Sequence, residues 1–195
     1  GTGQIINLTR SGFDDSRPRF SSDGSLVYWI TDREGSRNLD QDSTTVDVFG
    51  LFLNQKAWDR FQLSKEDFAL LKEREEKSKQ EAEKGKEKEK EAKAVEPIVI
   101  DWKGLEDRKV RLTVHPAALA DMALSRDGEK LFYLAKFDKG FDLWSCNLRT
   151  KETKQVTKLE AKQAALERAE DGKSLFVLAD GKLSKVDPES GKREN

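Results

Sequence analysis

Residues 21–30 read Ser-Ser-Asp-Gly-Ser-Leu-Val-Tyr-Trp-Ile, and the rest of the fold can be worked out from this stretch. The Asp-Gly pair favours the positive φ angles that a tight turn between antiparallel strands requires. The apolar run after it is continuous rather than alternating, which is typical of a strand buried on both faces. The stretch therefore predicts a β-hairpin whose second strand is covered on each side.

The same pattern occurs three times in the chain. Its turn glycines are Gly24, Gly128 and Gly172, and an aspartate precedes each of them. Apolar residues follow each glycine at the same distances, and a threonine stands 15 positions before it. The matching positions are Val27, Leu131 and Leu175; Tyr28, Phe132 and Phe176; Ile30, Leu134 and Leu178; and Thr9, Thr113 and Thr157. Three units in one register indicate an internal repeat.

Each unit predicts four antiparallel strands. A shorter strand is expected before each turn. In the third unit Arg168 stands where this strand should carry an apolar residue, so the first strand of the third unit is the weakest of the predicted strands. Further strands are expected at 49–53, 143–148, 155–157 and 183–186. Gly128 and Gly172 lie 44 residues apart, a spacing typical of a propeller blade, and single blades must stack to bury their faces. We therefore predict an all-β fold, a partial β-propeller of about three four-stranded antiparallel blades.

The whole chain, residues 1–195, is expected to form one incomplete propeller with an insertion. Gly24 and Gly128 lie 104 residues apart, which is one repeat of 44 and a further 60. The surplus falls between the third and fourth strands of blade 1, at the sheet end that carries the Asp-Gly turns, and should project from that end. The expected bounds are about 10–53 plus 110–113 for blade 1, 54–109 for the insertion, 117–157 for blade 2 and 160–195 for blade 3.

A charged helix is expected to begin at Ser64 inside the insertion. The Ser64 hydroxyl can cap free backbone N–H groups, and Asp67 completes a box-like arrangement. The side chains expected to dock its first turn on the blade are Phe68, Leu70 and Leu71, and Gly85 predicts a break. Because no apolar stripe at heptad spacing follows, a solvated excursion is favoured over a partner-docking arm.

The two ends of the chain suggest self-association. The chain is expected to open with a lone strand, Gln4 to Thr9, of the type that comes fourth in a blade, and to end after the third strand of blade 3. Both ends would then expose unpaired strand edges. We predict a homodimer by strand or blade complementation, in which Gln4–Thr9 of one chain completes the last blade of the other.

Composition excludes several classes of function. The 36 basic side chains are balanced by 37 acidic ones, so the basic excess of a nucleic-acid binder is absent. Apolar runs are far shorter than the roughly 20 residues that span a bilayer. Cys146 and His115 are each the sole residue of their type, which excludes internal disulfides, multi-Cys zinc sites and His-rich metal sites.

No site of known chemistry stands out. His115 has no accompanying nucleophile signature, and no Gly-rich phosphate loop occurs. The stretch from Asp40 to Thr44 slightly resembles a calcium loop, but it lacks the required glycine, and Leu51 replaces the bidentate glutamate. We predict no catalytic residue, no cofactor-binding residue and no metal ligand in this chain.

Two sets of residues resemble a known family. The repeats at Asp23-Gly24 and Asp127-Gly128 resemble the TolB-like, or PD40, propeller repeat. Residues 57–64, Ala-Trp-Asp-Arg-Phe-Gln-Leu-Ser, and residues 100–108, Ile-Asp-Trp-Lys-Gly-Leu-Glu-Asp-Arg, look like the propeller region of bacterial tricorn-like proteases. The resemblance implies a parent serine peptidase of the tail-processing class, peptidase family S41, whose members are usually exported to the periplasm. It also implies that the propeller gates and guides peptides, while PDZ and catalytic domains further along supply the nucleophile and base.

Three functions are compatible with this sequence. The preferred one is a non-catalytic propeller that guides peptide substrates toward a catalytic domain outside this chain. Because the first strand of each blade lines the axis, the predicted channel-lining residues are Arg17, Arg19 and Asp121. The alternative is a free-standing TolB-like propeller that recruits protein partners. A carbohydrate-binding propeller rests on aromatic content alone and ranks last. No nucleic acid and no membrane span are expected.

Overall fold

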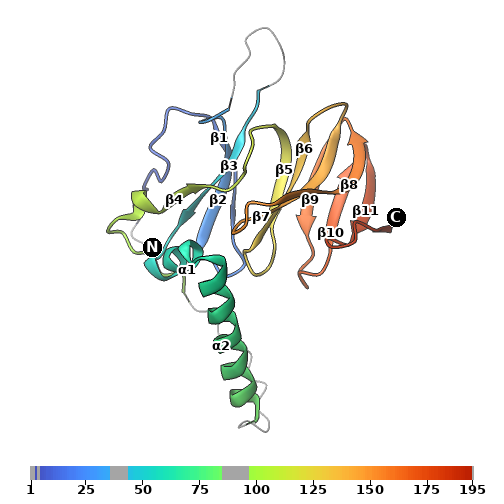
Figure 1. The fold of residues 1–195 in the computed structure, drawn as a ribbon. Coiled ribbons are helices and arrows are strands. Elements are labelled where there is room, and N and C mark those ends of the chain that lie inside the picture. Colours follow the sequence, from blue (N-terminus) through green and yellow to red (C-terminus); the bar gives the residue numbers. More distant parts are fainter. Residues whose placement is uncertain (1–2, 4, 36–43, 85–96, 195) are drawn as a thin grey trace.

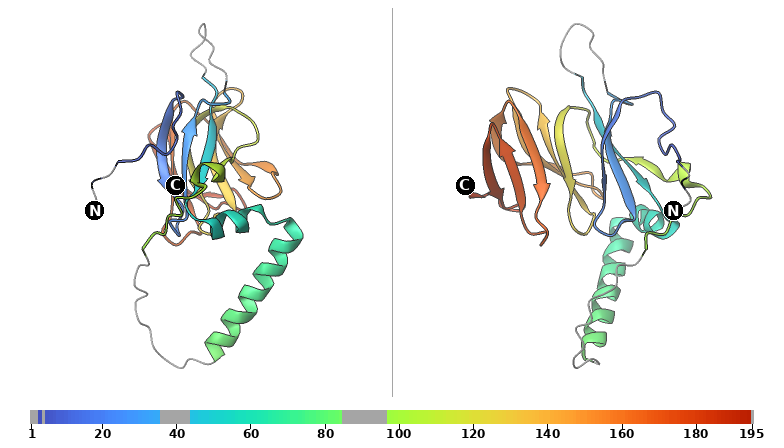
Figure 2. Two further views of the ribbon diagram at one scale, coloured as in Figure 1. Left: turned by 90° about the vertical axis from the view of Figure 1, so that its left-hand side faces the viewer. Right: turned by 180° about the vertical axis from the view of Figure 1, so that it is seen from behind.

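The computed structural model describes residues 3, 5–35, 44–84 and 97–194. In this part of the chain, three four-stranded antiparallel sheets stand side by side, and in each sheet the strands follow the order of the sequence (Figure 1). The sheets are arranged in chain order from one end of the molecule to the other (Figure 2). The predicted all-β fold of four-stranded blades is confirmed.

The elements have the following bounds. Blade 1 contains β1 (Asp15–Phe20), β2 (Leu26–Thr31), β3 (Asp47–Phe52) and β4 (Lys109–Arg111). Blade 2 contains β5 (Ala118–Leu124), β6 (Lys130–Lys136), β7 (Phe141–Asn147) and β8 (Thr153–Ala161). Blade 3 contains β9 (Ala164–Arg168), β10 (Leu175–Ala179), β11 (Lys182–Val186) and β12 (Arg193–Glu194). Between β3 and β4 lie α1 (Gln55–Gln62), α2 (Lys65–Lys84) and the 3-10 helix η1 (Leu105–Arg108).

The three predicted hairpin turns are present. Gly24, Gly128 and Gly172 have φ angles of +69°, +72° and +71°, a left-handed conformation that glycine adopts without a steric penalty. Each turn joins the first and second strands of its blade. The ability of glycine to adopt a positive φ, on which the prediction of the turns rests, is therefore used at all three turns.

Each second strand turns alternate residues toward opposite neighbours. In β6, Leu131 and Tyr133 pack toward blade 1, whereas Phe132 and Leu134 pack toward blade 3. The expectation that this strand is buried on both faces is confirmed for β2, which is buried along its whole length. It is wrong for β10, where buried and exposed residues alternate, because among the described residues blade 2 covers one face of this strand and nothing covers the other.

The insertion projects from the sheet end that carries the Asp-Gly turns, as predicted (Figure 1). The Ser64 hydroxyl accepts a hydrogen bond from the Asp67 N–H at 3.0 Å and donates one to the Asp67 carboxylate at 2.8 Å, so the predicted helix start is confirmed. Phe68 is buried, but Leu70 is 53% exposed. Docking through Leu70 is therefore wrong, because residues two apart do not share a helix face. The break predicted at Gly85 lies outside the described residues.

The sequence pattern does not predict α1. The Asn54 side chain caps this helix by accepting a hydrogen bond from the Ala57 N–H at 2.9 Å. The rings of Trp58 and Phe61 then pack on Phe52 of β3, with centroid separations of 5.5 and 4.8 Å. This aromatic contact attaches the start of the insertion to blade 1.

Blade 2 holds the base of the inserted helices from the other side. The Arg149 guanidinium donates hydrogen bonds to the carbonyls of Phe61 at 3.2 Å and Arg60 at 3.3 Å, and it lies 3.7 Å from the centroid of the Phe68 ring. Lys72 of α2 pairs with Glu129 of blade 2 at 2.6 Å. An insertion that leaves blade 1 is thus anchored to both blades.

Both predictions about the chain ends are wrong. Residues 5–9 form no strand, because the Asn7 side chain accepts hydrogen bonds from the N–H groups of Thr9 and Arg10 at 3.1 and 2.9 Å and curls the backbone; Gln4 lies outside the described residues. In blade 3, the Asp187 carboxylate accepts hydrogen bonds from the N–H groups of Glu189 and Ser190 and reverses the chain. The returning β12 pairs with β11 and occupies the position assigned to a partner's strand.

Candidate functional site at the propeller axis

The first strands of the three blades meet at one buried carboxylate. Asp121 of β5 is 3% exposed. Its Oδ1 accepts a hydrogen bond from Arg19 of β1 at 3.2 Å, and its Oδ2 accepts one from the Leu166 N–H of β9 at 2.8 Å. One side chain therefore links all three blades through charge-assisted hydrogen bonds.

Irregular backbone brings these side chains to the axis. The β1–β2 register shifts between Ser16 and Arg19, where Arg17 has a φ of +53°, and the β5–β6 register shifts between Leu119 and Asp121. Such bulges bend a strand and redirect its side chains. The position of the charged groups therefore depends on two departures from regular pairing.

The two arginines of β1 differ in how they are held. The Arg17 side chain is 56% exposed, and its guanidinium lies 3.8 Å from Asp121. Arg19 is 27% exposed, donates a further hydrogen bond to the Leu166 carbonyl at 3.3 Å and pairs with Glu167 at 3.4 Å. Arg19 is thus fixed in place, while Arg17 extends into solvent beside it.

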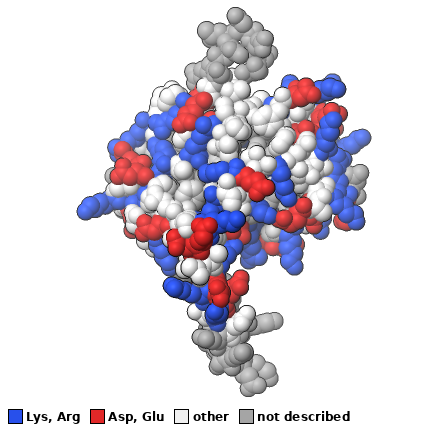
Figure 3. Space-filling view, viewed as in Figure 1, with Lys and Arg blue, Asp and Glu red and all other residues white. Residues whose placement is uncertain are grey.

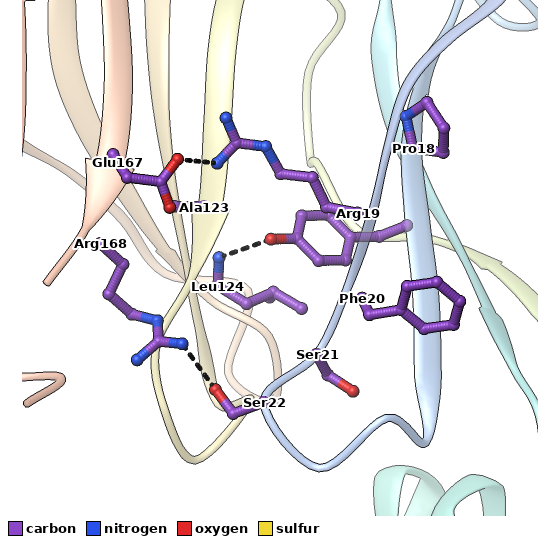
Figure 4. A pocket seen from close by; sticks show the side chains of 10 residues that line it. Pro18, Arg19, Phe20, Ser21, Ser22, Ala123, Leu124, Glu167 and Arg168 are labelled. Atoms are coloured by element: carbon purple, nitrogen blue, oxygen red, sulfur yellow. Dashed lines mark hydrogen bonds and ion pairs between the residues drawn. The ribbon is translucent and has the colours of Figure 1, made fainter. Parts of the chain in front are cut away.

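A groove of about 430 Å³ opens between β1, β5 and β9 (Figure 4). Arg19 reaches across it from β1 to Glu167, and Arg168 reaches back from β9 to the Ser22 hydroxyl, which lies 2.8 Å away. The lining residues are Pro18, Arg19, Phe20, Ser21, Ser22, Tyr28, Ala123, Leu124, Glu167 and Arg168. Side chains of blades 1 and 3 therefore face each other across the groove.

The groove is polar and carries more positive than negative side chains. Arg19 and Arg168 line it together with one acid, Glu167, while Asp121 lies buried behind Arg19. Burial raises the pKa of Tyr28, whose hydroxyl accepts a hydrogen bond from the Leu124 N–H at 3.3 Å. Guanidinium and hydroxyl groups in this arrangement suit carboxylates and peptide carbonyls.

The structure brings Arg17, Arg19 and Asp121 together, and of these three predicted residues Arg19 lines the groove, whereas Arg17 and Asp121 do not. The contacts of Asp121 make it a residue that positions Arg19. The sequence interpretation missed Glu167 and Arg168. The repeat contains a signal for Glu167, which precedes Gly172 by five residues, as Arg19 precedes Gly24.

The remaining sequence candidates lie away from this groove. His115 is exposed in a loop, and Cys146 is fully buried, where burial raises the pKa of its thiol. The calcium-like stretch lies outside the described residues except for Thr44. Trp29 is 5% exposed, whereas Trp102 is 56% exposed.

Lys and Arg side chains are interspersed with Asp and Glu on the face that Figure 3 displays. Among the helices that the structure describes, none has the length and apolar character to cross a membrane.

No protein-family model and no curated protein matches the sequence. Solved structures do match it. TolB from Acinetobacter baumannii has a TM-score of 0.55 at 11% identity, over 96% of this chain and 33% of that one. The tricorn protease has a TM-score of 0.51 at 14% identity, over 95% and 18%. The Pyrococcus horikoshii acylaminoacyl peptidase has a TM-score of 0.51 at 13% identity, over 94% and 24%.

These likenesses concern the fold. The chain spans a third or less of the three matched chains, and at such identities the similarity extends to architecture alone. The domain is propeller-like and resembles TolB and the propellers of proteases.

Proposed function

We propose that this propeller guides peptide segments along its axial groove toward a catalytic domain of a tricorn-like serine peptidase of family S41. The observation that carries the proposal is the groove itself, which is formed by the first strands of three blades and lined by Arg19 and Arg168. The sequence resemblance at residues 57–64 and 100–108 supports the protease context. The same resemblance carries the proposal of a periplasmic location, which cell fractionation tests.

The lining chemistry favours peptides with acidic side chains. Arg168 lines the groove and donates hydrogen bonds to two neutral groups, the Ser22 hydroxyl at 2.8 Å and the Ala169 carbonyl at 3.5 Å. A ligand carboxylate can replace the contact with Ser22. Arg19 is the second cation of the lining. A peptide chain also offers backbone carbonyls to the same donors. Basic peptides would meet like charges and bind more weakly.

Peptide titration tests this proposal. A fluorescein-labelled decapeptide rich in Asp and Glu is titrated by anisotropy, with the same peptide carrying Asn and Gln as its neutral match. We expect Arg168→Ala to weaken binding of the acidic peptide about tenfold, the effect of losing one charge-assisted hydrogen bond. Arg74→Ala, which removes an exposed arginine from α2, changes net charge equally and should leave the affinity unchanged.

Two outcomes count against the proposal. Equal weakening by Arg168→Ala and Arg74→Ala would assign the binding to overall charge rather than to the groove. Absence of peptide binding by the folded chain would favour the alternative, a TolB-like scaffold that recruits proteins through another surface.

A further inference from the structure

A second cleft lies between blades 1 and 2 at the base of the insertion, at the sheet end that carries the Asp-Gly turns (Figure 1). This turn-end cleft has a volume of about 340 Å³. The turns of blades 1 and 2 line it at Asp23 and Asp127, and α1 and α2 line it at Phe61 and Phe68. Because Arg149 of blade 2 also holds α1, the cleft has walls from both blades and from the inserted helices.

The turn-end cleft continues the axial groove. Ser21 lines both of them. On blade 1 the lining passes from Tyr28 in the groove to Leu26 in the cleft. On blade 2 it passes from Leu124 to Arg126. Both steps run two residues toward the turn, so a peptide in the axial groove reaches the cleft by continuing along blades 1 and 2.

The charged side chains of the turn-end cleft have partners already, with one exception. Glu129 pairs with Lys72 at 2.6 Å. Arg60 pairs with Glu75 at 2.5 Å. The two turn aspartates accept hydrogen bonds from hydroxyl and N–H groups of their own turns. The exception is Arg126, which is exposed and pairs with no acid among the described residues. A charged ligand would have to displace an existing partner everywhere else in the cleft.

The surface that remains for a ligand is apolar. It consists of Leu26, Phe52, Ala57, Phe61 and Phe68. The rings of Phe52 and Phe61 already contact each other, with centroids 4.8 Å apart, and aromatic rings favour further rings at such distances. Ligand pockets span about 300–1,000 Å³, and the turn-end cleft lies at the lower end of this range. Its size and lining therefore suit one large apolar side chain.

We propose that the turn-end cleft binds an aromatic or large aliphatic side chain of the peptide that the axial groove holds. This inference rests on the proposed function of the groove, and it adds that the preferred peptides carry an apolar residue close to their acidic ones. The spacing follows from the chain itself. Ser22 is the partner of Arg168 across the groove, and it is the neighbour of Ser21, which lines both spaces. Since neighbouring Cα atoms lie about 3.8 Å apart, the acidic and apolar residues of the peptide are separated by a few positions at most.

A pair of matched peptides tests the inference. The acidic decapeptide is prepared with Phe at its centre and with Ala at the same position, so that acidic residues flank the test residue on both sides. Both peptides are titrated by anisotropy into the 195-residue chain. We expect the Phe peptide to bind about tenfold more tightly, because burial of its ring in the cleft adds to the polar contacts of the groove.

Filling the cleft should remove this preference. Ala57→Met places a longer side chain on α1 at the cleft lining, and methionine keeps a high helix propensity. We expect the preference for Phe over Ala to fall from about tenfold to less than about twofold. Ala69→Met is the matched control, because Ala69 is exposed on α2 outside the cleft lining, and it should keep the preference.

Crosslinking locates the apolar residue without any change to the protein. The central Phe is replaced by p-benzoylphenylalanine, and mass spectrometry after irradiation should find crosslinks in α1 or α2. Crosslinks found only outside the cleft lining would overturn the inference. Equal affinities of the Phe and Ala peptides would also overturn it, and the proposed function would stand if Arg168→Ala still weakened both. Absence of binding by either peptide would overturn the proposed function and this inference together.

Discussion

The outer faces of the first and last blades are built from the same strand pattern but have different environments. On blade 1, Val27 and Trp29 are 9% and 5% exposed, because residues before and after the inserted helices cover them. On blade 3, Phe176 and Leu178 are 39% and 44% exposed. The comparison shows that an apolar strand does not by itself establish burial, which depends on what packs against each face.

The cover over blade 1 is held by a buried arginine. Arg108 is 2% exposed, and its guanidinium donates hydrogen bonds to the carbonyls of Phe52 at 3.1 Å and Leu53 at 3.4 Å at the end of β3. It also donates to the Lys103 carbonyl at 3.0 Å and to the Asp101 carbonyl. The returning part of the insertion therefore closes the outer face of blade 1, while the outgoing part forms the helical arm.

The largest expected difference concerns equivalent leucines of blades 2 and 3. Leu134→Ala should lower the free energy of unfolding by about 2–5 kcal/mol, because it leaves a cavity between blades. Leu178→Ala, at the same register position, should lower it by less than about 0.5 kcal/mol. Urea unfolding of both variants measures this difference. Similar losses would mean that the outer face of blade 3 is covered in solution.

The cover over blade 1 should be the next most sensitive feature. Arg108→Met removes hydrogen bonds to four carbonyls and should lower the free energy of unfolding by about 3 kcal/mol, because hydrogen bonds from a charged donor are among the stronger ones. The substitution should also shift Trp29 fluorescence toward that of a solvated indole. Arg74→Met on exposed α2 is the control and should have no measurable effect. A silent Arg108→Met would show that the cover is held by its apolar contacts alone.

A substitution at Asp121 tests whether this carboxylate links blade 1 to blade 3. Asp121→Asn keeps the side-chain shape but loses the charge and leaves either Arg19 or the Leu166 N–H without its acceptor. We expect a loss of about 2 kcal/mol and faster hydrogen exchange in both β1 and β9. Exchange that rises in one strand only would contradict the link between three blades.

The smallest expected effects concern a turn hydroxyl that blades 1 and 2 have and blade 3 lacks. Ser125 donates to Asp127 at 2.6 Å and accepts from the Lys130 N–H at 2.9 Å, whereas Ala169 stands at this position in blade 3. Ser125→Ala should lower the free energy of unfolding by about 1 kcal/mol. Ala169→Ser should raise it by about 0.5 kcal/mol, because the new hydroxyl can accept a hydrogen bond from the Ser174 N–H. Urea midpoints that move in the same direction would rule out this explanation.

The same turn predicts a dependence on pH. Burial opposes ionisation of Asp127, but hydrogen bonds from the Ser125 hydroxyl and the Glu129 N–H outweigh it, so the pKa of Asp127 lies below its ordinary value of 3.8. Its contribution to stability is therefore present above about pH 3.8 and is lost as pH falls through the lowered pKa. Ser125→Ala should reduce this loss, which acid titration of the unfolding free energy measures.

The hairpins could be predicted because their signals are local. Asp-Gly turns, apolar runs and a repeated register lie within a few residues of each other, and the capped helix start at Ser64 is equally local. The helix α1 and the short β12 could not be predicted in this way. Packing on Phe52 and hydrogen bonds from Arg149 stabilise α1. Phe52 belongs to the neighbouring strand, and Arg149 lies 88 residues from Phe61, so neither contact follows from the pattern of the helix itself.

The candidate site also combines features that the local sequence predicts with features that depend on contacts between blades. The positions of Arg17 and Arg19 on a first strand could be predicted from the repeat and from propeller geometry. The burial of Asp121 could not, because it depends on the Leu166 N–H of another blade and on a bulge in β5. Arg168 was unexpected as a lining residue, since its sequence position predicts an apolar side chain.

The amino-acid sequence alone determined the number of blades, their turns and the two-sided character of their second strands, since these depend on backbone conformation and on alternation along a strand. Tertiary structure decided which of those faces is covered, where the insertion is anchored and which charges meet at the axis. These features depend on contacts between residues up to about 150 positions apart, such as Arg19 with Leu166, and the enthalpy of such contacts is set by packing that no local pattern encodes.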